Sequence, residues 1–290
     1  MKKFVALVLL LCMVLTLAAC AKMSVSMQEI YDATQTEAML KNHQSVSIRD
    51  KMDGELFNER YLTKEYIFDY VPNAESDWAE FVTDNSCYSY LGGAYVRYLP
   101  IAPDGVSDGF ASYRTEYYAS VILDAETVDE VITSVSKKDG RFYAKSVLSQ
   151  KILESMAEFG VTSGNFEYVL DAKTREILSI EGNYTYNDDS THQMTSEISY
   201  DAEVPEMVKT FLEYANQTEN LRTITVVTNP GTDKEVSQSV QVPKDLLVGL
   251  RYYEDSEYTF EVYTDAACTE AYDPYADTAS DLTIYVKWVH

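Results

Sequence analysis

The sequence has few of the side chains that most enzymes and metal centres use. It contains three histidines, His43, His192 and His290, and four cysteines among 290 residues. None of them forms the His-Glu-x-x-His or Cys-x-x-Cys spacing that is typical of zinc sites. The sequence also lacks Gly-x-Ser-x-Gly, P-loop and dinucleotide-binding patterns. We therefore expect no metal, no cofactor and no enzymatic activity.

Basic residues are scarce relative to acidic ones. The chain carries 23 lysines and arginines against 47 aspartates and glutamates, a formal net charge of −24. Nucleic-acid binding depends on basic side chains that neutralise phosphates, and anionic lipid headgroups attract basic rather than acidic surfaces. The composition therefore excludes a nucleic-acid partner and a polybasic membrane-binding surface. It favours a soluble, strongly hydrated exterior.

The first residues, MKKFVALVLLLCMVLTLAAC, have the pattern of a secretory leader. Lys2 and Lys3 precede an uncharged apolar run from Phe4 to Leu17, which is shorter than the roughly 20 residues that a membrane-spanning helix needs. We therefore predict a signal peptide over residues 1–19. Its removal takes away two lysines and no acid, which leaves a formal charge of −26.

The end of this leader, Leu17-Ala18-Ala19-Cys20, resembles the bacterial lipobox, in which the cysteine is lipidated and becomes the first mature residue. The resemblance implies that Cys20 carries acyl chains, and two lipid signals give stable membrane attachment. We expect residues 20–27 to form a lipidated tether on the extracytoplasmic face of the bacterial cell membrane. The alternative is an ordinary cleavage site at which Cys20 is incidental.

Beyond Cys20, only Cys87 and Cys268 remain. An oxidising exterior permits a disulfide, but the two residues fall in different predicted domains, and we expect two lone buried thiols. A nucleophilic Cys87 would need a neighbouring base such as His43 or His192. The alternative, a small buried hydrophobe, is favoured.

Apolar periodicity predicts an α+β chain dominated by strands. Helical spacing occurs over residues 27–43 and 143–160, with Gly160 as a helix C-cap, and residues 206–220 form a short helix or a linker. Alternation of apolar and polar residues indicates antiparallel strands over residues 45–71, 87–101, 110–123 and 165–205. Turns are expected at Gly92-Gly93, at Asp171 to Thr174 and at Asn187 to Ser190, and the last two define a three-stranded meander.

This order of elements resembles the lipoprotein-carrier superfamily of the LolA and LolB type. The stretches that carry the likeness are EIYDATQTEAMLKNHQSVSI and YVLDAKTREILSIEGNYTYNDD. In the second stretch, a family strand-turn-strand motif is matched by Leu170, Asp171, Lys173, Thr174 and Ile177. The resemblance implies an unclosed antiparallel half-barrel over residues 28–218, packed over helices with an apolar cavity between.

The C-terminal residues 219–290 resemble the internalin-type B-repeat, a small β-grasp-like module of bacterial surface proteins. The matching residues are Tyr258-Thr259-Phe260, Tyr263-Thr264-Asp265, Cys268-Thr269, Tyr272-Asp273, and Leu282-Thr283-Ile284-Tyr285 with Lys287-Trp288. Glu261 and Val262 stand where the family usually has Gly-Trp. A core tryptophan supplies a large buried surface. Because this one is missing, we expect the module to be stabilised by packing against the neighbouring domain.

Two sets of residues are candidates for binding. Ile152, Leu153, Met156 and Phe159 lie on one face of the predicted second helix and are candidates for holding a lipid or other apolar ligand. The alternative is that they fill a core. Asp273, Asp277 and Asp281 recur every four residues in a turn-rich segment that a calcium ion could use, although solvated loop acids are the favoured interpretation.

These patterns predict a surface-anchored, non-enzymatic lipoprotein whose leading role is binding an apolar ligand in the N-terminal domain. The alternative is an interaction or structural protein. In that case the B-repeat-like domain and exposed tyrosines would contact another surface protein or the cell wall, and the tyrosines would form a large exposed patch.

Replacing Cys20 with alanine tests the anchor. We expect Cys20→Ala to abolish incorporation of a labelled fatty acid and to remove the protein from the membrane fraction, because the acyl chains supply the attachment. Cys12→Ala changes the other cysteine of the leader and is expected to keep both. Fatty-acid labelling of Cys20→Ala at the level of the unmodified chain would contradict the lipobox interpretation.

Overall fold

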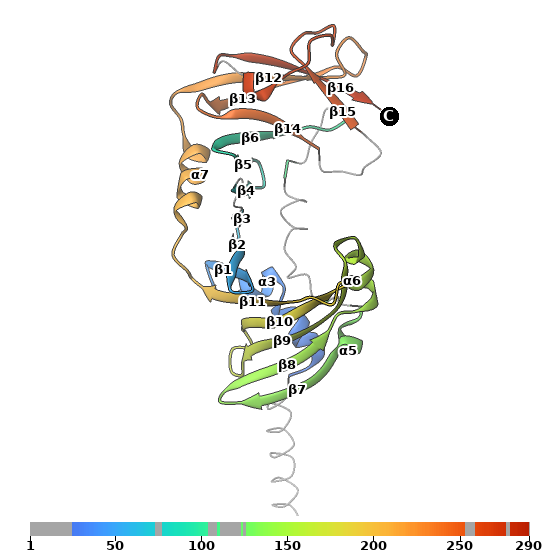
Figure 1. Ribbon diagram of the computed structural model, residues 1–290. Helices are drawn as coiled ribbons and strands as arrows, with labels where there is room; N and C mark the ends of the chain where they lie inside the picture. The colour runs from blue at the N-terminus through green and yellow to red at the C-terminus, as the bar shows by residue number, and fades with distance from the viewer. Residues whose placement is uncertain are drawn as a thin grey trace, which may run out of the picture. The chain divides into compact units, whose positions relative to one another are not determined.

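The computed structural model describes residues 25–72, 77–103, 109–110, 123, 126–252, 259–276 and 279–289 (Figure 1). The predicted signal peptide and Cys20 lie outside the described residues. The chain divides into two compact units, each made of two separate segments. The first unit contains residues 1–57 and 119–201, and the second contains residues 58–118 and 202–290.

The first unit is built on an open antiparallel sheet in the order β1-β11-β10-β9-β8-β7 (Figure 1). Its strands are β1 (Ser45–Met52), β7 (Ile132–Lys138), β8 (Arg141–Val147), β9 (Val161–Asp171), β10 (Ile177–Tyr186) and β11 (Thr191–Tyr200). Successive residues of a strand point to opposite faces, and one face of this sheet is buried. Ala144, Tyr168 and Ile180 lie opposite one another on three neighbouring strands and are almost fully buried.

The β9–β11 meander confirms the expected strand-turn-strand pattern. At the first turn, the Asp171 carboxylate accepts hydrogen bonds from the backbone N–H groups of Lys173 and Thr174, both at 2.8 Å. At the second turn, Asp188 accepts from the backbone and the hydroxyl of Ser190. Aspartate favours such local bonds to the backbone, which is why it marks turns.

The helix predicted over residues 27–43 is wrong in its length, because the chain forms two short helices there. They are α2 (Met27–Ala33) and α3 (Thr36–Met39). Ser26 and Glu29 form a capping box at the start of α2. At its end, the Thr34 hydroxyl donates to the carbonyl of Tyr31, and Gln35 is extended with ψ 138°. Helix α2 therefore ends at Thr34, whose side chain competes for backbone hydrogen bonds.

The helix predicted over residues 143–160 is also wrong in its length. Residues 143–147 belong to strand β8, and only α6 (Gln150–Ser155) and the 3-10 turn η1 (Ala157–Phe159) are helical. Ser149 caps α6 by accepting from Ile152 N at 3.2 Å. Gly160 ends η1 with φ 76°, a left-handed conformation that glycine adopts without a steric cost, which confirms its predicted capping role. A further short helix, α5 (Val128–Val131), precedes β7.

Strands of two sheets lie in the second unit. One contains β2 to β6 and β14, namely β2 (Glu55–Thr63), β3 (Tyr66–Val71), β4 (Trp78–Thr83), β5 (Cys87–Leu91), β6 (Ala94–Pro100) and β14 (Leu247–Arg251). The other has the order β13-β12-β16-β15, from β12 (Leu221–Thr228), β13 (Val236–Pro243), β15 (Thr259–Tyr263) and β16 (Leu282–Val289). The predicted turn at Gly92-Gly93 joins β5 to β6, and both glycines have positive φ.

The helix α7 (Glu206–Asn216) confirms the helical alternative predicted for residues 206–220. Its Phe211 is fully buried in the core of the second unit. The Phe211 ring lies 5.5 Å from the Phe81 ring and 5.5 Å from the Tyr95 ring, measured between centroids. Phe68 and Tyr88 are the next aromatic neighbours. One core cluster contains these residues together with buried residues of both sheets, so α7 supplies the side chain around which they pack.

The C-terminal residues do not pack alone within the second unit. Strand β14 pairs in parallel with β6, from Leu247 opposite Val96 to Arg251 opposite Pro100. The compact units also do not follow the predicted boundary between residues 218 and 219. The half-barrel over 28–218 and the B-repeat-like domain over 219–290 therefore stay predictions about independently folding domains. Within the described residues, every helix is too short or too polar to cross a bilayer.

Replacing Phe211 with alanine tests the role of α7 in the second unit. We expect Phe211→Ala to lower the free energy of unfolding by about 3–5 kcal/mol, because it leaves a cavity among aromatic rings. Glu213→Ala removes an exposed residue two positions further along α7 and serves as the control. Chemical denaturation followed by tyrosine fluorescence measures both. Equal unfolding midpoints for the two variants would exclude Phe211 as the centre of this core.

Candidate functional site

The predicted ligand-binding residues are accessible in the first unit. Ile152, Leu153 and Met156 are half-buried, and Phe159 keeps 67% of its surface exposed. Neither α6 nor η1 contains a buried residue. The exposure of Phe159 departs from the alternative that these side chains fill a core, whereas half-buried Ile152, Leu153 and Met156 are compatible with either interpretation. We call these four residues the apolar helix surface.

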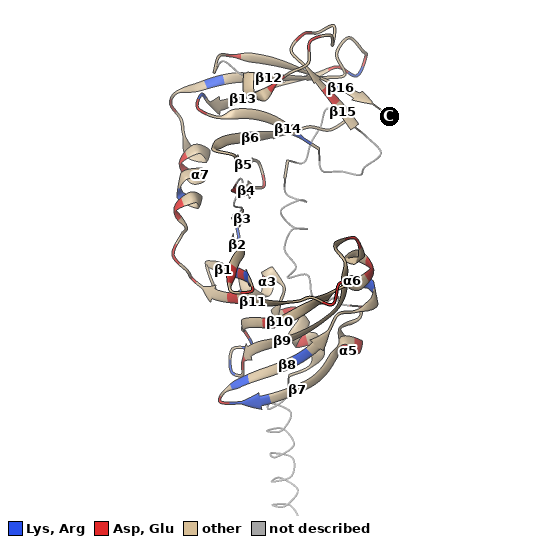
Figure 2. Cartoon of the chain, viewed as in Figure 1, with Lys and Arg blue, Asp and Glu red and all other residues tan. Residues whose placement is uncertain are grey.

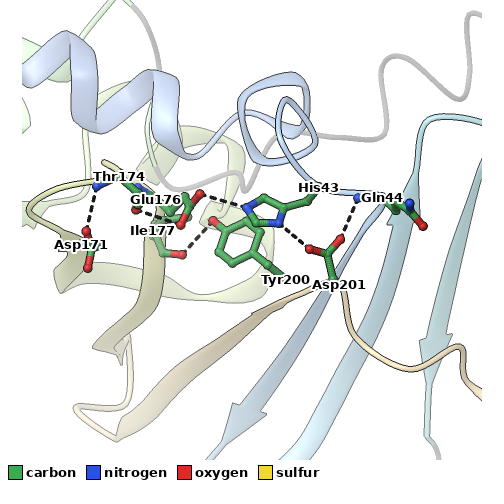
Figure 3. A network of polar contacts seen from close by, with 8 residues as sticks. All are labelled: His43, Gln44, Asp171, Thr174, Glu176, Ile177, Tyr200 and Asp201. Atoms are coloured by element: carbon green, nitrogen blue, oxygen red, sulfur yellow. Dashed lines mark hydrogen bonds and ion pairs between the residues drawn. The ribbon is translucent and has the colours of Figure 1, made fainter.

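A polar network in the same unit surrounds His43, which follows α3 and precedes β1 (Figure 3). Its Nδ1 atom lies 2.8 Å from Asp201 Oδ2, and its Nε2 atom lies 2.9 Å from Glu176 Oε1. The other oxygen of Asp201 accepts a hydrogen bond from the backbone N–H of Gln44 at 2.8 Å. The imidazole of His43 thus bridges a carboxylate directly before β10 and a carboxylate directly after β11.

The protonation state of His43 follows from these partners. An ionised carboxylate only accepts hydrogen bonds, so two carboxylate partners favour the form of His43 in which both ring nitrogens carry a proton. The hydrogen bond to Asp201, then the one to Glu176, raises the pKa of His43 above its usual 6.5, against a smaller opposing effect of burial. The hydrogen bond from His43 lowers the pKa of Asp201 below its usual 3.8. When both ring nitrogens are protonated, neither has a free lone pair, so this arrangement suits His43 as an ion-pair partner of Asp201 and Glu176.

Neighbouring groups hold the two carboxylates in place. Thr174 Oγ1 donates to Glu176 Oε2 at 2.8 Å, and Thr174 belongs to the turn that Asp171 closes. The Tyr200 ring lies against the imidazole, with centroids 4.5 Å apart, and its hydroxyl donates to the carbonyl of Ile177 at 2.9 Å. Burial raises the pKa of Tyr200 well above its usual 10, so it stays a neutral donor.

A cavity of about 240 Å³ lies beside this network. Its lining includes Glu29, Asp32, Lys41, Arg175 and Glu176. Arg175 approaches Glu29 at 3.9 Å. Charges of both signs therefore line the cavity, which suits a lipid tail poorly because an apolar chain would desolvate them.

The remaining predicted site residues make ordinary local contacts. Asp273 accepts from the backbone N–H of Tyr275 at 2.9 Å, and Asp281 accepts from the backbone N–H of Thr223 at 2.7 Å. Asp277 lies outside the described residues. Among the described residues, no group of three or more histidine, cysteine or acidic side chains is placed to hold a metal ion.

Both remaining cysteines are free thiols. Cys87 is fully buried, as expected, and the Arg251 guanidinium is 3.6 Å from its sulfur. Cys268 is only half-buried, which departs from the expected buried thiol. Both candidate bases contact acidic side chains, since His43 contacts Asp201 and Glu176 and His192 contacts Asp53 at 2.6 Å.

The tyrosines in the described part of the chain do not form the exposed patch that a tyrosine-mediated interaction would need. Of the tyrosines that the structure describes, all but Tyr275 are buried or half-buried, and Tyr275 is 68% exposed. Tyr61, Tyr88, Tyr168 and Tyr184 are among the buried ones. The tyrosine-rich composition therefore serves mainly to pack the pleated strands.

No protein-family model and no curated protein matches the chain. The chain is similar to a Mycobacterium tuberculosis lipoprotein, LppX, with 10% identity over 62% of this chain and 96% of that one, at a TM-score of 0.38. It is also similar to MucB in complex with MucA, with 10% identity over 63% of this chain and 58% of that one, at a TM-score of 0.25. A Pseudomonas aeruginosa MucA/MucB complex gives 10% identity over 74% and 75%, also at 0.25. The chain thus spans less than two thirds of the first MucB chain, and likenesses this weak support no argument about fold or function.

Sequence reasoning named His43 only as a base for Cys87 and missed its network. The available signals were two acidic residues, Glu176, which lies two residues after the first predicted turn, and Asp201, which lies near the end of the predicted strands. Their meeting point depends on strand order, which the sequence pattern did not specify.

The His43 network predicts a bell-shaped dependence of stability on pH. A histidine whose folded pKa is raised contributes stability that is complete below its unfolded value of 6.5 and is lost as pH rises through the folded pKa. Asp201, whose folded pKa is lowered, contributes above 3.8 and loses its contribution as pH falls through its folded pKa. We expect His43→Gln to destabilise the chain on the order of 1 kcal/mol between about pH 4 and 6.5, since part of the network is solvent-screened.

The measurement is the unfolding midpoint of the unmodified chain and of His43→Gln across pH 3–9. Asp201→Asn should remove most of the same pH dependence. A constant difference between the unmodified chain and His43→Gln over the whole range would show that the imidazole acts only by its shape.

Proposed function

We propose that the chain is an extracytoplasmic, lipid-anchored and non-enzymatic binding protein that holds an apolar ligand, such as a lipid acyl chain, in its N-terminal part. The observation that carries this proposal is the accessibility of the apolar helix surface. Phe159 is 67% exposed, and a ligand that covers it removes apolar surface from water, which stabilises the complex. Full burial of one large apolar side chain is worth about 1.5–3 kcal/mol.

The local structure supports a binding role for this surface. Ser149 fixes the start of α6 and Gly160 fixes the end of η1, so the segment presents its side chains from a capped and defined backbone. A preorganised surface loses less conformational entropy on binding than a mobile one. The anchor at Cys20, a prediction from the leader, would keep the protein close to a source of lipid.

The absence of a free base in the His43 network supports a non-enzymatic role in that region. Both ring nitrogens of His43 are engaged with carboxylates, and general-base catalysis needs an available lone pair. A role for the B-repeat-like region in contacting a surface protein or the cell wall stays the alternative, and the burial of the described tyrosines disfavours the tyrosine-mediated form of it.

Native mass spectrometry with organic extraction tests the proposal on the secreted chain from residue 21, which retains every described element. We expect a stoichiometric apolar molecule bound to the unmodified chain. Phe159→Ser combined with Met156→Ser should reduce its occupancy about tenfold or more, because two apolar contacts are lost. Phe57→Ser, at a phenylalanine that is 54% exposed on β2, is the matched control and should leave occupancy unchanged.

An apo mass for the unmodified chain after gentle handling, repeated after incubation with bacterial phospholipid vesicles, would overturn the apolar-ligand proposal. Equal loss in Phe57→Ser would instead show that occupancy follows general surface apolarity.

A further inference from the structure

Strand β13 lies at one end of the four-stranded sheet of the second unit. In the neighbouring strand β12, the backbone N–H of Thr223 donates to Asp281 Oδ1 at 2.7 Å. The backbone groups of Thr223 therefore point away from β13. Gln241 is the residue of β13 opposite Thr223. In an antiparallel pair, such a residue directs its own N–H and C=O outward, and every second residue along the strand does the same. The backbones of Ser237, Ser239 and Gln241 therefore face outward from the sheet.

In the part of the chain that the structure describes, this edge has little of the protection that end strands usually carry. Native proteins block such edges with charged residues, proline, bulges or covering elements. The β13 sequence VSQSVQVP contains no charged residue, and its proline stands at the end (Figure 2). Its pairing with β12 is continuous from Val236 to Pro243. The outward backbone groups at Ser237 and Ser239 thus form a regular row.

A cavity of about 210 Å³ opens beside this edge. Val236 and Val240 of β13 form part of its lining. The other apolar lining residues are Leu99 of β6, Ile101 just after β6, and Val226 of β12. Leu99 and Ile101 are 5% exposed and Val226 is 7% exposed, so the floor is apolar and well packed. Val236 and Val240 are half-buried at the rim. Asn85, Arg97 and Thr228 are among the polar members of the lining, so the apolar floor suits a single aliphatic side chain.

Two hydrogen bonds fix the walls of this cavity. Arg97 Nη1 donates to the carbonyl of Gln241 at 2.7 Å, which joins β6 to the outer edge of β13. Asn229 Nδ2 donates to the carbonyl of Pro103 at 2.8 Å, which joins the end of β12 to the segment after β6. The cavity and the edge therefore belong to one preorganised site. Arg97 binds the outward carbonyl of Gln241, and the outward backbone groups of Ser237 and Ser239 are the ones proposed for pairing.

We propose that the β13 edge and this cavity bind an extended peptide segment of another protein by strand addition. The row of outward N–H and C=O groups repeats every two residues, about 6.8 Å, which is the repeat of an extended backbone. A lipid has no such groups. The added strand is uncharged where it pairs with β13, and one aliphatic side chain enters the cavity.

The charge of the chain decides between a different protein and a second copy. The chain has a net charge of −24, so two copies repel each other, whereas a segment with basic residues on its flanks is attracted. The partner is therefore a segment with alternating aliphatic residues and basic flanks. This inference goes beyond apolar-ligand binding in the first unit and does not depend on it.

Proline at position 239 tests strand addition most directly. The outward N–H of Ser239 takes no part in the ladder with β12, so Ser239→Pro removes a donor from the edge while the sheet keeps its hydrogen bonds. Ser239→Ala keeps the backbone donor and is the matched control. The probe is a synthetic peptide of alternating threonine and valine with a lysine at each end. Its control is the same peptide N-methylated at alternate threonines.

The readouts are the affinity for the probe and the hydrogen-exchange rates of the Ser237, Ser239 and Gln241 amides. We expect the peptide to slow exchange at these amides, and Ser239→Pro to weaken binding about tenfold or more while Ser239→Ala keeps it within about twofold. Equal affinity of Ser239→Pro and the unmodified chain, or no slowing of exchange at these amides, would overturn the proposal.

A second variant keeps the test decisive if Ser239→Pro unfolds. Val236→Phe fills the mouth of the cavity from its rim and should weaken binding of the valine-containing peptide, while a peptide with glycine in place of valine is unaffected by the change. Concentration-dependent dimerisation that Ser239→Pro abolishes, without peptide binding by the unmodified chain, would assign the edge to a second copy and overturn the proposal.

Discussion

The antiparallel register of the β9–β11 meander is the constraint on which the His43 network depends. Glu176 directly precedes β10 and Asp201 directly follows β11, so the pairing of these two strands brings both carboxylates to the same end of the sheet. His43 reaches them because β1 pairs with β11, from Val46 opposite Tyr200 onward. A shift of one residue in either pairing would turn the side chains to the opposite face. The electrostatics of the network therefore follow from backbone hydrogen bonds.

Both proposed binding surfaces arise where a short or terminal element leaves groups that its own unit does not cover. In the first unit, Ser149 and Gly160 confine α6 and η1 to little more than two turns, which is too short to bury four apolar side chains against a sheet. In the second unit, β13 ends its sheet, and its outward backbone groups have no neighbouring strand among those in that sheet. The first surface offers apolar area and the second offers hydrogen bonds, so each selects a different kind of ligand.

The errors in the predicted helices have a common physical origin. Over residues 143–160, Val147 and Leu148 fit the helical spacing of Ile152, yet residues 143–147 pair with β9. Periodicity in a short apolar run does not distinguish a helix from a strand, and pairing between strands outweighed it here. Over residues 27–43, the helical spacing continued across Thr34, whose hydroxyl bonds to the backbone and ends α2. The meander was predicted well because its turns rest on local bonds of Asp171 and Asp188 to the neighbouring backbone.

Features encoded within a few residues were readable from the order of amino acids: the leader pattern ending at Cys20, the acidic exterior, the aspartate turns, the Gly160 cap and the alternation of the strands. The C-terminal segment shows where this reading ends. A resemblance predicted only a small β-grasp-like module there. The parallel pairing of β14 with β6 joins residues about 150 positions apart, and Phe211 of α7 packs against aromatic residues of strands β3 to β6. Contacts between distant residues depend on loop closure and side-chain packing, whose free energies are distributed over many residues rather than over neighbouring positions. Folding therefore decided where His43 finds its carboxylates, which apolar side chains stay exposed and which strand edge is left open.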